Sequence, residues 1–254
     1  MPQPYESEQP LPGGFVSDAV LAGGTVRKPP PRDPEFVRGL LRHFEEHGWD
    51  GAPRFLGTDD RGREVLGFVD GVVPWRPNDE PPSIRSERGL AAVARLVRRF
   101  HDLTAGTELA GRHEVVCHND LSPRNTVYRE TGGRLFPVAF IDWDIAGPGE
   151  RIHDVAHVCW QYVGLGPGVA DAAAAGRLVR VIADAYGLAD RSALIDTVLW
   201  WQDRCWRGIE AAAGAGEPAM VRLRELGTVD VVRAAHDWTR DHRDLLRSAV
   251  GARD

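Results

Sequence analysis

Three polar residues in the middle of the chain could form one site for chemistry on a phosphate. Asp120 and Asn125 lie in one short loop, and Asp142 follows an apolar segment that we expect to pair back onto the segment after Asn125. Such a site offers a carboxylate that can accept a hydroxyl proton, and an amide oxygen and a second carboxylate that can hold a hard divalent cation. Phosphoryl transfer needs this set, because it depends on positioning and charge neutralisation.

Lys28 is the only lysine of the chain, since all the other residues among the 31 basic ones are Arg. A coding bias can explain the loss of lysine in general. A lysine that remains is typical of a site that needs one compact ammonium beside a phosphate, where the wide guanidinium of Arg does not substitute easily. Strand alternation places Val26 on the same face as Lys28.

Three segments resemble the aminoglycoside phosphotransferase and choline kinase group of small-molecule kinases, which are relatives of the protein kinases. They are residues 117–125 (CHNDLSPRN), 140–144 (FIDWD) and 149–156 (GERIHDVA). The resemblance is motif-specific over 115–156 and extends in layout over about 13–245. It implies that Asp120 is the catalytic base, that Asn125 and Asp142 bind Mg²⁺, and that ATP is the phosphate donor, with GTP also open.

The resemblance also implies where the nucleotide binds. Lys28 stands at the distance from Asp120 at which the family places its phosphate-contacting residue, and Val26 would line the adenine pocket. The connector after the last small strand, with Gly67, Phe68 and Val69, would meet the adenine edge through its backbone. Arg124 would reach the transferred phosphate, although a simple loop cation is an equal alternative.

Two features depart from the family pattern. The chain has no G-x-G-x-x-G loop, and Gly13-Gly14 would provide only a short hairpin. The helix that should supply a glutamate partner to Lys28 offers Glu35 near its start and Glu45 and Glu46 at its end, and we favour Glu35. Asp144 is either a further acidic contact to the metal or a solvated loop residue, while His118 is expected to be structural.

The elements that must position these residues predict an α+β, bilobal, protein-kinase-like fold. Short strands are expected at 15–21, 25–28, 54–56 and 64–69, helices at about 34–48 and 86–103, and paired strands around the Asp120 loop. Residues 1–12 read as a flexible tail, 13–72 as a small β-rich N-lobe that binds nucleotide, and 73–254 as a larger, mainly helical C-lobe that carries the catalytic loop, the metal site and the acceptor-binding helices. The stretch 210–217 is expected to be a loop between helices.

Composition limits the partners. The 254 residues include 43% hydrophobic and 27% charged residues, with a net charge of -6, which is typical of a globular protein and argues against nucleic acid as a partner. Three cysteines fit a reducing cytoplasm, and no apolar run approaches the ~18 residues of a membrane helix. The sequence leaves open whether the protein is a monomer or a dimer.

The expected partner is a small-molecule hydroxyl acceptor, with an aminoglycoside-type antibiotic first. A metabolite alcohol (choline, homoserine or a sugar) and a catalytically silent nucleotide-binding module remain alternatives. Residues 196–210 carry acids and tryptophans that suit a cationic, polyhydroxylated acceptor, but tryptophans on helices are usually core and helical acids usually solvated. The residues concerned are Asp196, Asp203, Glu210, Trp200, Trp201 and Trp206.

Overall fold

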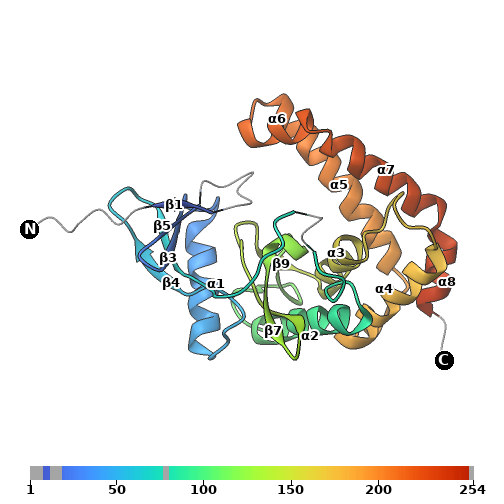
Figure 1. The fold of residues 1–254 in the computed structure, drawn as a ribbon, viewed down its shortest axis with the longest axis horizontal. Helices are drawn as coiled ribbons and strands as arrows, with labels where there is room; N and C mark the ends of the chain where they lie inside the picture. Colours follow the sequence, from blue (N-terminus) through green and yellow to red (C-terminus); the bar gives the residue numbers. More distant parts are fainter. Residues whose placement is uncertain (1–7, 12–18, 77–79, 252–254) are drawn as a thin grey trace, which may run out of the picture. The chain divides into compact units, whose positions relative to one another are not determined.

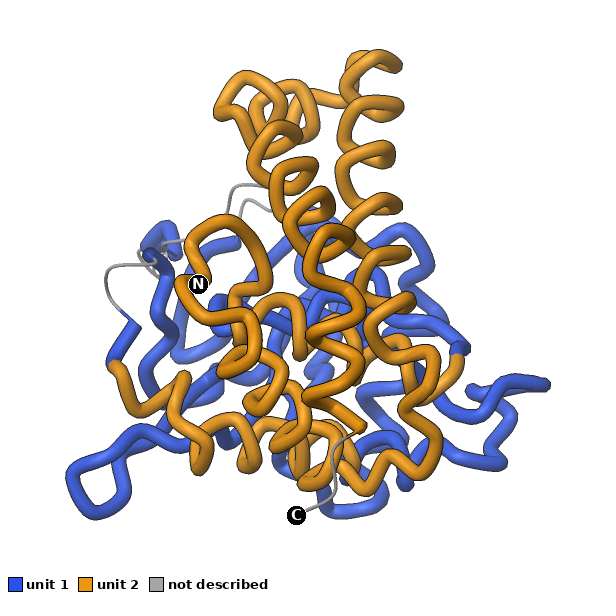
Figure 2. The backbone as a smooth tube through the Cα atoms, turned by 90° about the vertical axis from the view of Figure 1, so that its right-hand side faces the viewer, with its two compact units in different colours: residues 1–81, 99–149 blue, residues 82–98, 150–254 orange. Residues whose placement is uncertain are grey.

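The computed structural model describes residues 8–11, 19–76 and 80–251. The chain divides into two compact units, residues 1–81 with 99–149 and residues 82–98 with 150–254 (Figure 2). The predicted lobe boundary between residues 72 and 73 stays a prediction. Each of the two units combines two separate segments of the chain, so their division does not test a boundary at a single position. The α+β class is confirmed.

The first unit contains a five-stranded antiparallel sheet with the order β1-β2-β3-β5-β4 (Figure 1). The strands are β1 (Gln9–Pro10), β2 (Val20–Ala22), β3 (Thr25–Lys28), β4 (Phe55–Thr58) and β5 (Glu64–Gly67). Gly23 and Gly24 join β2 to β3 with φ of 56° and 72°, which glycine adopts without steric cost. The β3–β5 register places Lys28 opposite Glu64 and Val26 opposite Leu66.

Strand β1 lies in the stretch expected to be a tail. It pairs with β2, and the Glu8 carboxylate just before it contacts the guanidinium groups of Arg61 and Arg63 at 3.2 and 2.7 Å. The residues around Gly13-Gly14 lie outside the described residues. The same holds for most of the first expected strand, 15–21, of which the structure describes only 19–21, where β2 begins.

Helix α1 (Pro34–Glu46) begins where the sequence indicates. The Asp33 side chain accepts a hydrogen bond from the backbone N–H of Phe36, and Pro34 occupies the first turn, where its missing N–H has no consequence. Its apolar residues recur at helical spacing and are buried; they are Val37, Leu40, Leu41 and Phe44. Phe44 packs against the rings of Trp49, Phe100 and Trp143, of which Phe100 and Trp143 are buried in the core of this unit.

Two antiparallel strand pairs of the same unit carry the central motifs. Strand β6 (Val115–Cys117) pairs with β9 (Gly147–Gly149), and β7 (Thr126–Thr131) pairs with β8 (Arg134–Phe140). A 3₁₀ turn, Pro123–Asn125, precedes β7. Helix α2 (Glu87–Thr104) begins in the second unit and ends in the first.

The second unit is otherwise helical, as expected. It contains α3 (Arg151–Val163), α4 (Ala172–Tyr186), α5 (Leu194–Gly214), α6 (Pro218–Glu225), α7 (Thr228–Asp241) and α8 (Arg243–Gly251). Helix α5 packs on α3, α6 and α7, while α4 packs on α8. The expectation of a loop at 210–217 is wrong for 210–214, because the Ala-rich end of α5 has high helix propensity and continues to Gly214, and residues 215–217 form the connection to α6. Within the described residues, no helix has the length and apolar character that a membrane crossing requires.

Candidate active site

The loop after β6 brings Asp120 and Asn125 into direct contact. The amide nitrogen of Asn125 donates to both the Asp120 carboxylate and the Asp120 backbone carbonyl, each at 2.8 Å. The 3₁₀ turn makes this possible, because it turns the chain back within five residues. The two side chains that the sequence motif predicts to be base and metal ligand are therefore neighbours.

Asp142 joins this loop through the backbone. The Ile141 N–H donates to the Asn125 carbonyl at 2.9 Å, and the Asn119 amide donates to the Ile145 carbonyl at 2.9 Å. The ring of His118, which is fully buried, contacts the Ile141 carbonyl through Nε2 at 3.0 Å, as expected for a structural residue. These contacts fix the segment 141–145 against the segment 118–125.

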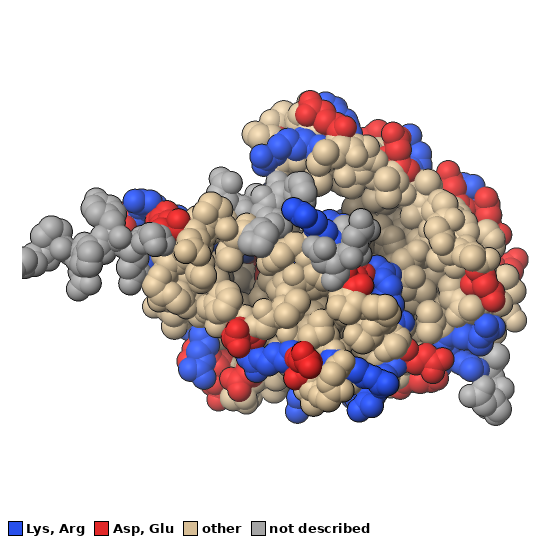
Figure 3. All heavy atoms as spheres, viewed as in Figure 1, with Lys and Arg blue, Asp and Glu red and all other residues tan. Residues whose placement is uncertain are grey.

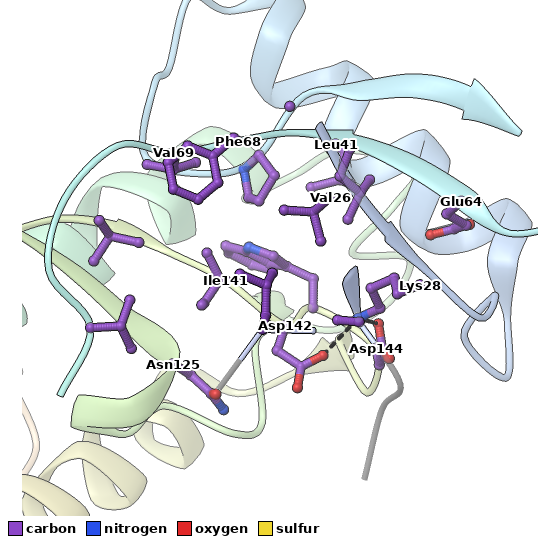
Figure 4. Close-up of a pocket in the computed structure, with 18 of the residues that line it drawn as sticks. Val26, Lys28, Leu41, Glu64, Phe68, Val69, Asn125, Ile141, Asp142 and Asp144 are labelled. Atoms are coloured by element: carbon purple, nitrogen blue, oxygen red, sulfur yellow. Dashed lines mark hydrogen bonds and ion pairs between the residues drawn. The ribbon is translucent and has the colours of Figure 1, made fainter. Parts of the chain in front are cut away.

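Lys28 is paired with two aspartates. Its ammonium donates to Asp142 Oδ1 at 2.7 Å and to Asp144 Oδ1 at 2.5 Å, and the residue is only 5% exposed (Figure 4). Burial by itself lowers the pKa of Lys28, but the charges of the two aspartates outweigh it, so that the pKa lies above its usual value. Lys28 is therefore a charged group inside the site, and Asp144 is one of its two partners.

The oxygen groups of this site fit a divalent cation. Asn125 offers an amide oxygen, since its nitrogen is committed to Asp120, and Asp142 and Asp144 offer carboxylates, which are the ligands that Mg²⁺ prefers. The Lys28 ammonium lies between the two carboxylates, so the protein itself already places a positive charge there.

Asp120 has the properties of a proton acceptor near neutral pH. Burial and the nearby Asp142 charge raise its pKa to about 7, against the opposing effects of the Asn125 hydrogen bond and the Arg124 charge. A base whose pKa lies close to the working pH is well matched to accept a proton from a hydroxyl.

A cavity of about 330 Å³ leads to these groups. Val26, Gly67, Phe68 and Val69, which the sequence assigned to the nucleotide, line it together with Lys28, Asn125 and Asp142, whereas Asp120 and Arg124 are not among the lining residues (Figure 4). Most of its other walls are apolar: Leu11, Ala19, Val37, Leu41, Pro53, Leu66, Gly71, Val73, Trp75, Val127, Ile141 and Trp143. A narrow apolar space that ends in charged groups suits a flat base with a phosphate tail.

The backbone of the connector differs from the expectation at one residue. The Gly67 N–H donates to the Arg54 carbonyl at 2.8 Å, so in this structure it is not a donor for a base. Phe68 and Val69, which follow the end of β5, are the other two predicted connector residues at the cavity.

The prediction that Glu35 pairs with Lys28 is wrong. Glu35 lies in the first turn of α1 with its side chain 81% exposed, and it contacts Arg38 at 2.8 Å. Arg38 also donates through Nε to Glu64 Oε1 at 3.0 Å, and the Glu64 side chain is 1% exposed. Glu64 was not among the residues predicted from the sequence, and its one local signal is that it begins an otherwise apolar strand.

The acids of α5 are already paired, which argues against their use for a cationic acceptor. Asp196 contacts Arg243 and Arg247, Asp203 contacts Arg207, and Glu210 contacts Arg233. Acidic and basic side chains likewise intermix over α6 and α7 (Figure 3). These ion pairs favour the alternative that the acids of α5 form a solvated helix face.

The tryptophans of α5 differ from one another. Trp201 is a core residue, 8% exposed, whose Nε1 donates to the His153 carbonyl at 2.7 Å. Trp200 is 44% exposed and stacks on the His153 ring with centroids 5.2 Å apart. Trp206 lies between the guanidinium groups of Arg207 and Arg233, 4.3 and 4.6 Å from its ring centroid. The Arg204 guanidinium also lies over the Trp200 ring, 5.4 Å from its centroid, so all three rings already have partners within the protein.

Comparison with known proteins finds one family model and one curated protein that are similar to this chain. Residues 105–193 match the model of the phosphotransferase enzyme family. The chain is similar to a trifolitoxin immunity protein of Rhizobium leguminosarum bv. trifolii, with 28% identity over 94% of this chain and 97% of the relative.

Solved structures share the fold. A choline/ethanolamine kinase family protein from Mesorhizobium loti matches with a TM-score of 0.58 and 15% identity, over 97% of this chain and 93% of its own. An aminoglycoside phosphotransferase from Streptomyces rimosus matches with a TM-score of 0.56 and 18% identity, over 76% of this chain and 90% of its own. The predicted resemblance and the kinase-like fold are thus confirmed, and the family match over residues 105–193 supports a phosphotransferase.

Proposed function

We propose that this chain, whose central part matches the phosphotransferase enzyme family, transfers the γ-phosphate of ATP to a hydroxyl of a small molecule, with an aminoglycoside-type antibiotic as the first candidate acceptor. The observation that carries the proposal is the hydrogen bond between the Asp120 carboxylate and Asn125, which lines the charged end of an apolar cavity. We place the reaction in the cytoplasm, because its reducing environment suits three cysteines that form no disulfide bond within the described residues.

In the proposed mechanism, Asp120 accepts the proton of the acceptor hydroxyl while that oxygen attacks the γ-phosphorus. The bond from the γ-phosphorus to the oxygen shared with the β-phosphate breaks, and ADP leaves with that electron pair. Mg²⁺, held by Asn125, Asp142 and Asp144, would supply charge neutralisation at the phosphate oxygens. Lys28 adds a second positive charge, and Arg124 is our candidate for contact with the transferred phosphate.

The test offers Mg-ATP and Mg-GTP separately with a pooled panel of aminoglycosides, other hydroxylated antibiotics and metabolite alcohols, and mass spectrometry detects any component that gains one phosphate. We expect one class of acceptor to be phosphorylated, and Asp120→Asn to lower kcat roughly 10²–10⁴-fold, because the amide cannot accept the proton.

The control is Asp50→Asn, the same chemical change at a carboxylate that is 91% exposed, and it should leave turnover unchanged. Turnover that persists in Asp120→Asn would refute the assignment of the base. Binding of Mg-nucleotide without any phosphorylated product would favour a silent nucleotide-binding module.

A second candidate function is immunity to a toxin, because the similarity to the trifolitoxin immunity protein spans nearly the whole of both chains. The panel therefore also includes trifolitoxin, and toxin-sensitive cells are tested for protection by the chain. Protection that is lost with Asp120→Asn would make the toxin a phosphate acceptor. Protection that survives the substitution would indicate immunity by binding. Phosphorylation of choline or ethanolamine instead would favour the metabolite kinase.

A further inference from the structure

Lys28 holds the same carboxylates that the proposed function needs for a metal. Its buried ammonium occupies oxygens of both Asp142 and Asp144. With a divalent cation bound to these carboxylates, the ammonium loses its partners and meets a like charge. Because a buried, unpaired ammonium is costly, Lys28 then needs other anions. The nucleotide phosphates are one such partner, and an acidic side chain beside Lys28 would hold the ammonium in position for them.

Glu64 is the third acidic residue that lines the cavity, beside Asp142 and Asp144. It stands directly opposite Lys28 in the antiparallel pairing of β3 with β5, so both side chains leave the sheet on the same face. Cross-strand partners have Cβ atoms about 4.5–5.5 Å apart, which is within the reach of a lysine side chain. In Figure 4, Glu64 and the two aspartates lie on either side of Lys28.

Arg38 prepares Glu64 for this role. Its Nε donates to Glu64 Oε1, which holds the carboxylate at the sheet and compensates its charge while Lys28 is with the aspartates. A carboxylate accepts hydrogen bonds on both oxygens, so the Arg38 contact is compatible with a second donor. Helix α1 thus contributes Arg38, and β5 contributes the acid, Glu64. This replaces the arrangement in which the helix itself supplies a glutamate partner to Lys28.

We propose that Glu64 is a positioning residue for Lys28: when Mg-nucleotide binds, the Lys28 ammonium leaves Asp142 and Asp144 and pairs with Glu64. This inference rests on the proposed function, since it requires that Mg-nucleotide binds in this cavity. A role of Glu64 only in anchoring α1 to the sheet through Arg38 is the alternative, and it predicts no effect on Lys28.

Because Lys28 is the only lysine, the full chain grown with [ε-¹³C]lysine gives a single side-chain NMR signal from this residue. The signal is followed while Mg-ADP is added, and calorimetry on the same samples measures binding. In wild type we expect the signal to move on binding. In Glu64→Gln we expect the unliganded signal to stay at the wild-type position, the bound signal to differ from wild type, and Mg-ADP affinity to fall about tenfold.

Two further variants separate positioning from folding. Glu64→Gln leaves Arg38 without its buried acid, so the double variant Arg38→Gln/Glu64→Gln, which keeps the net charge, should reproduce the same Lys28 signals. Glu35→Gln removes the other, exposed acid of Arg38 and should match wild type throughout.

The outcomes are distinct. A bound Lys28 signal that is the same in wild type, Glu64→Gln and the double variant would overturn the inference and leave the proposed function standing. A wild-type signal that does not move although calorimetry detects binding would do the same. Absence of Mg-ADP and Mg-GDP binding to wild type would overturn both.

Discussion

At the scale of single residues, the site stores backbone strain next to its functional groups. Asn119 and Asp142 have φ of 68° and 64°, and they are the only described residues other than glycine with positive φ. This left-handed region costs most residues about 1–2 kcal/mol, but Asn and Asp tolerate it through local hydrogen bonds. Asn119 precedes the proposed base, and Asp142 is a proposed metal ligand, so strain and function coincide here.

Asn119 allows this strain to be measured. We expect Asn119→Gly to be more stable than Asn119→Ala by about 1 kcal/mol, because both lose the hydrogen bond to the Ile145 carbonyl but only alanine pays for the left-handed backbone. Denaturant unfolding of both variants checks this. At the exposed helical residue Arg42 of the same unit the order should reverse, since glycine weakens a helix. Equal stability of the two Asn119 variants would contradict the argument.

At the scale of elements, helix α8 is tied to α5 by one carboxylate. Asp196 accepts from Arg243 Nε at 2.6 Å and from Arg247 Nη2 at 2.8 Å. The Arg243 hydrogen bond and the charges of both arginines lower the pKa of Asp196 below its usual value, outweighing the effect of partial burial. A carboxyl whose pKa is lower in the folded state adds stability above its unfolded pKa, near 3.9, and loses it as pH falls through the folded value.

We therefore predict that Asp196→Asn lowers Tm equally at pH 7 and pH 5, and that the difference from wild type shrinks as pH falls from 4 towards 2. The side chain is 38% exposed, so solvent screening limits the effect to about 1 kcal/mol or less. Thermal melts of the two proteins over this range check the prediction. Asp203→Asn, which breaks an exposed pair within α5, should change Tm less. A constant difference down to pH 2 would mean that Asp196 acts through packing.

Sequence reasoning succeeded for elements whose signals are local. The loop from Asp120 to Asn125 and the strand before Asp142 could be placed because short spacing and strand pairing fix their positions within one hairpin. It failed for the Arg38–Glu64 pair, because this contact joins a helix residue to a strand residue 26 positions further along the chain and depends on tertiary packing. It also failed for β1, where Gln9 and Pro10 have low strand propensity and edge pairing with β2 prevails.

At the scale of the whole molecule, the nucleotide cavity belongs to one of the two units. All the residues that line it lie within 1–81 and 99–149. Helix α2 belongs to both units, because residues 87–98 are part of the second unit and residues 99–104 are part of the first. A ligand stabilises the state that it binds, by about 2.7 kcal/mol at a concentration of 100 times Kd.

We therefore predict that Mg-ADP slows amide hydrogen exchange in the unit that lines the cavity and leaves α7 and α8 within about twofold of their unliganded rates, since local openings there do not disturb the cavity. The largest protection should appear at 64–69, 119–127 and 141–145. Exchange measured by mass spectrometry with and without Mg-ADP checks this, with Asp142→Asn, which removes a proposed metal ligand, as the control that should lose the protection. Equal protection of α7, α8 and the cavity segments would instead mean that the protein opens only as a whole, so that the two units form one cooperative body.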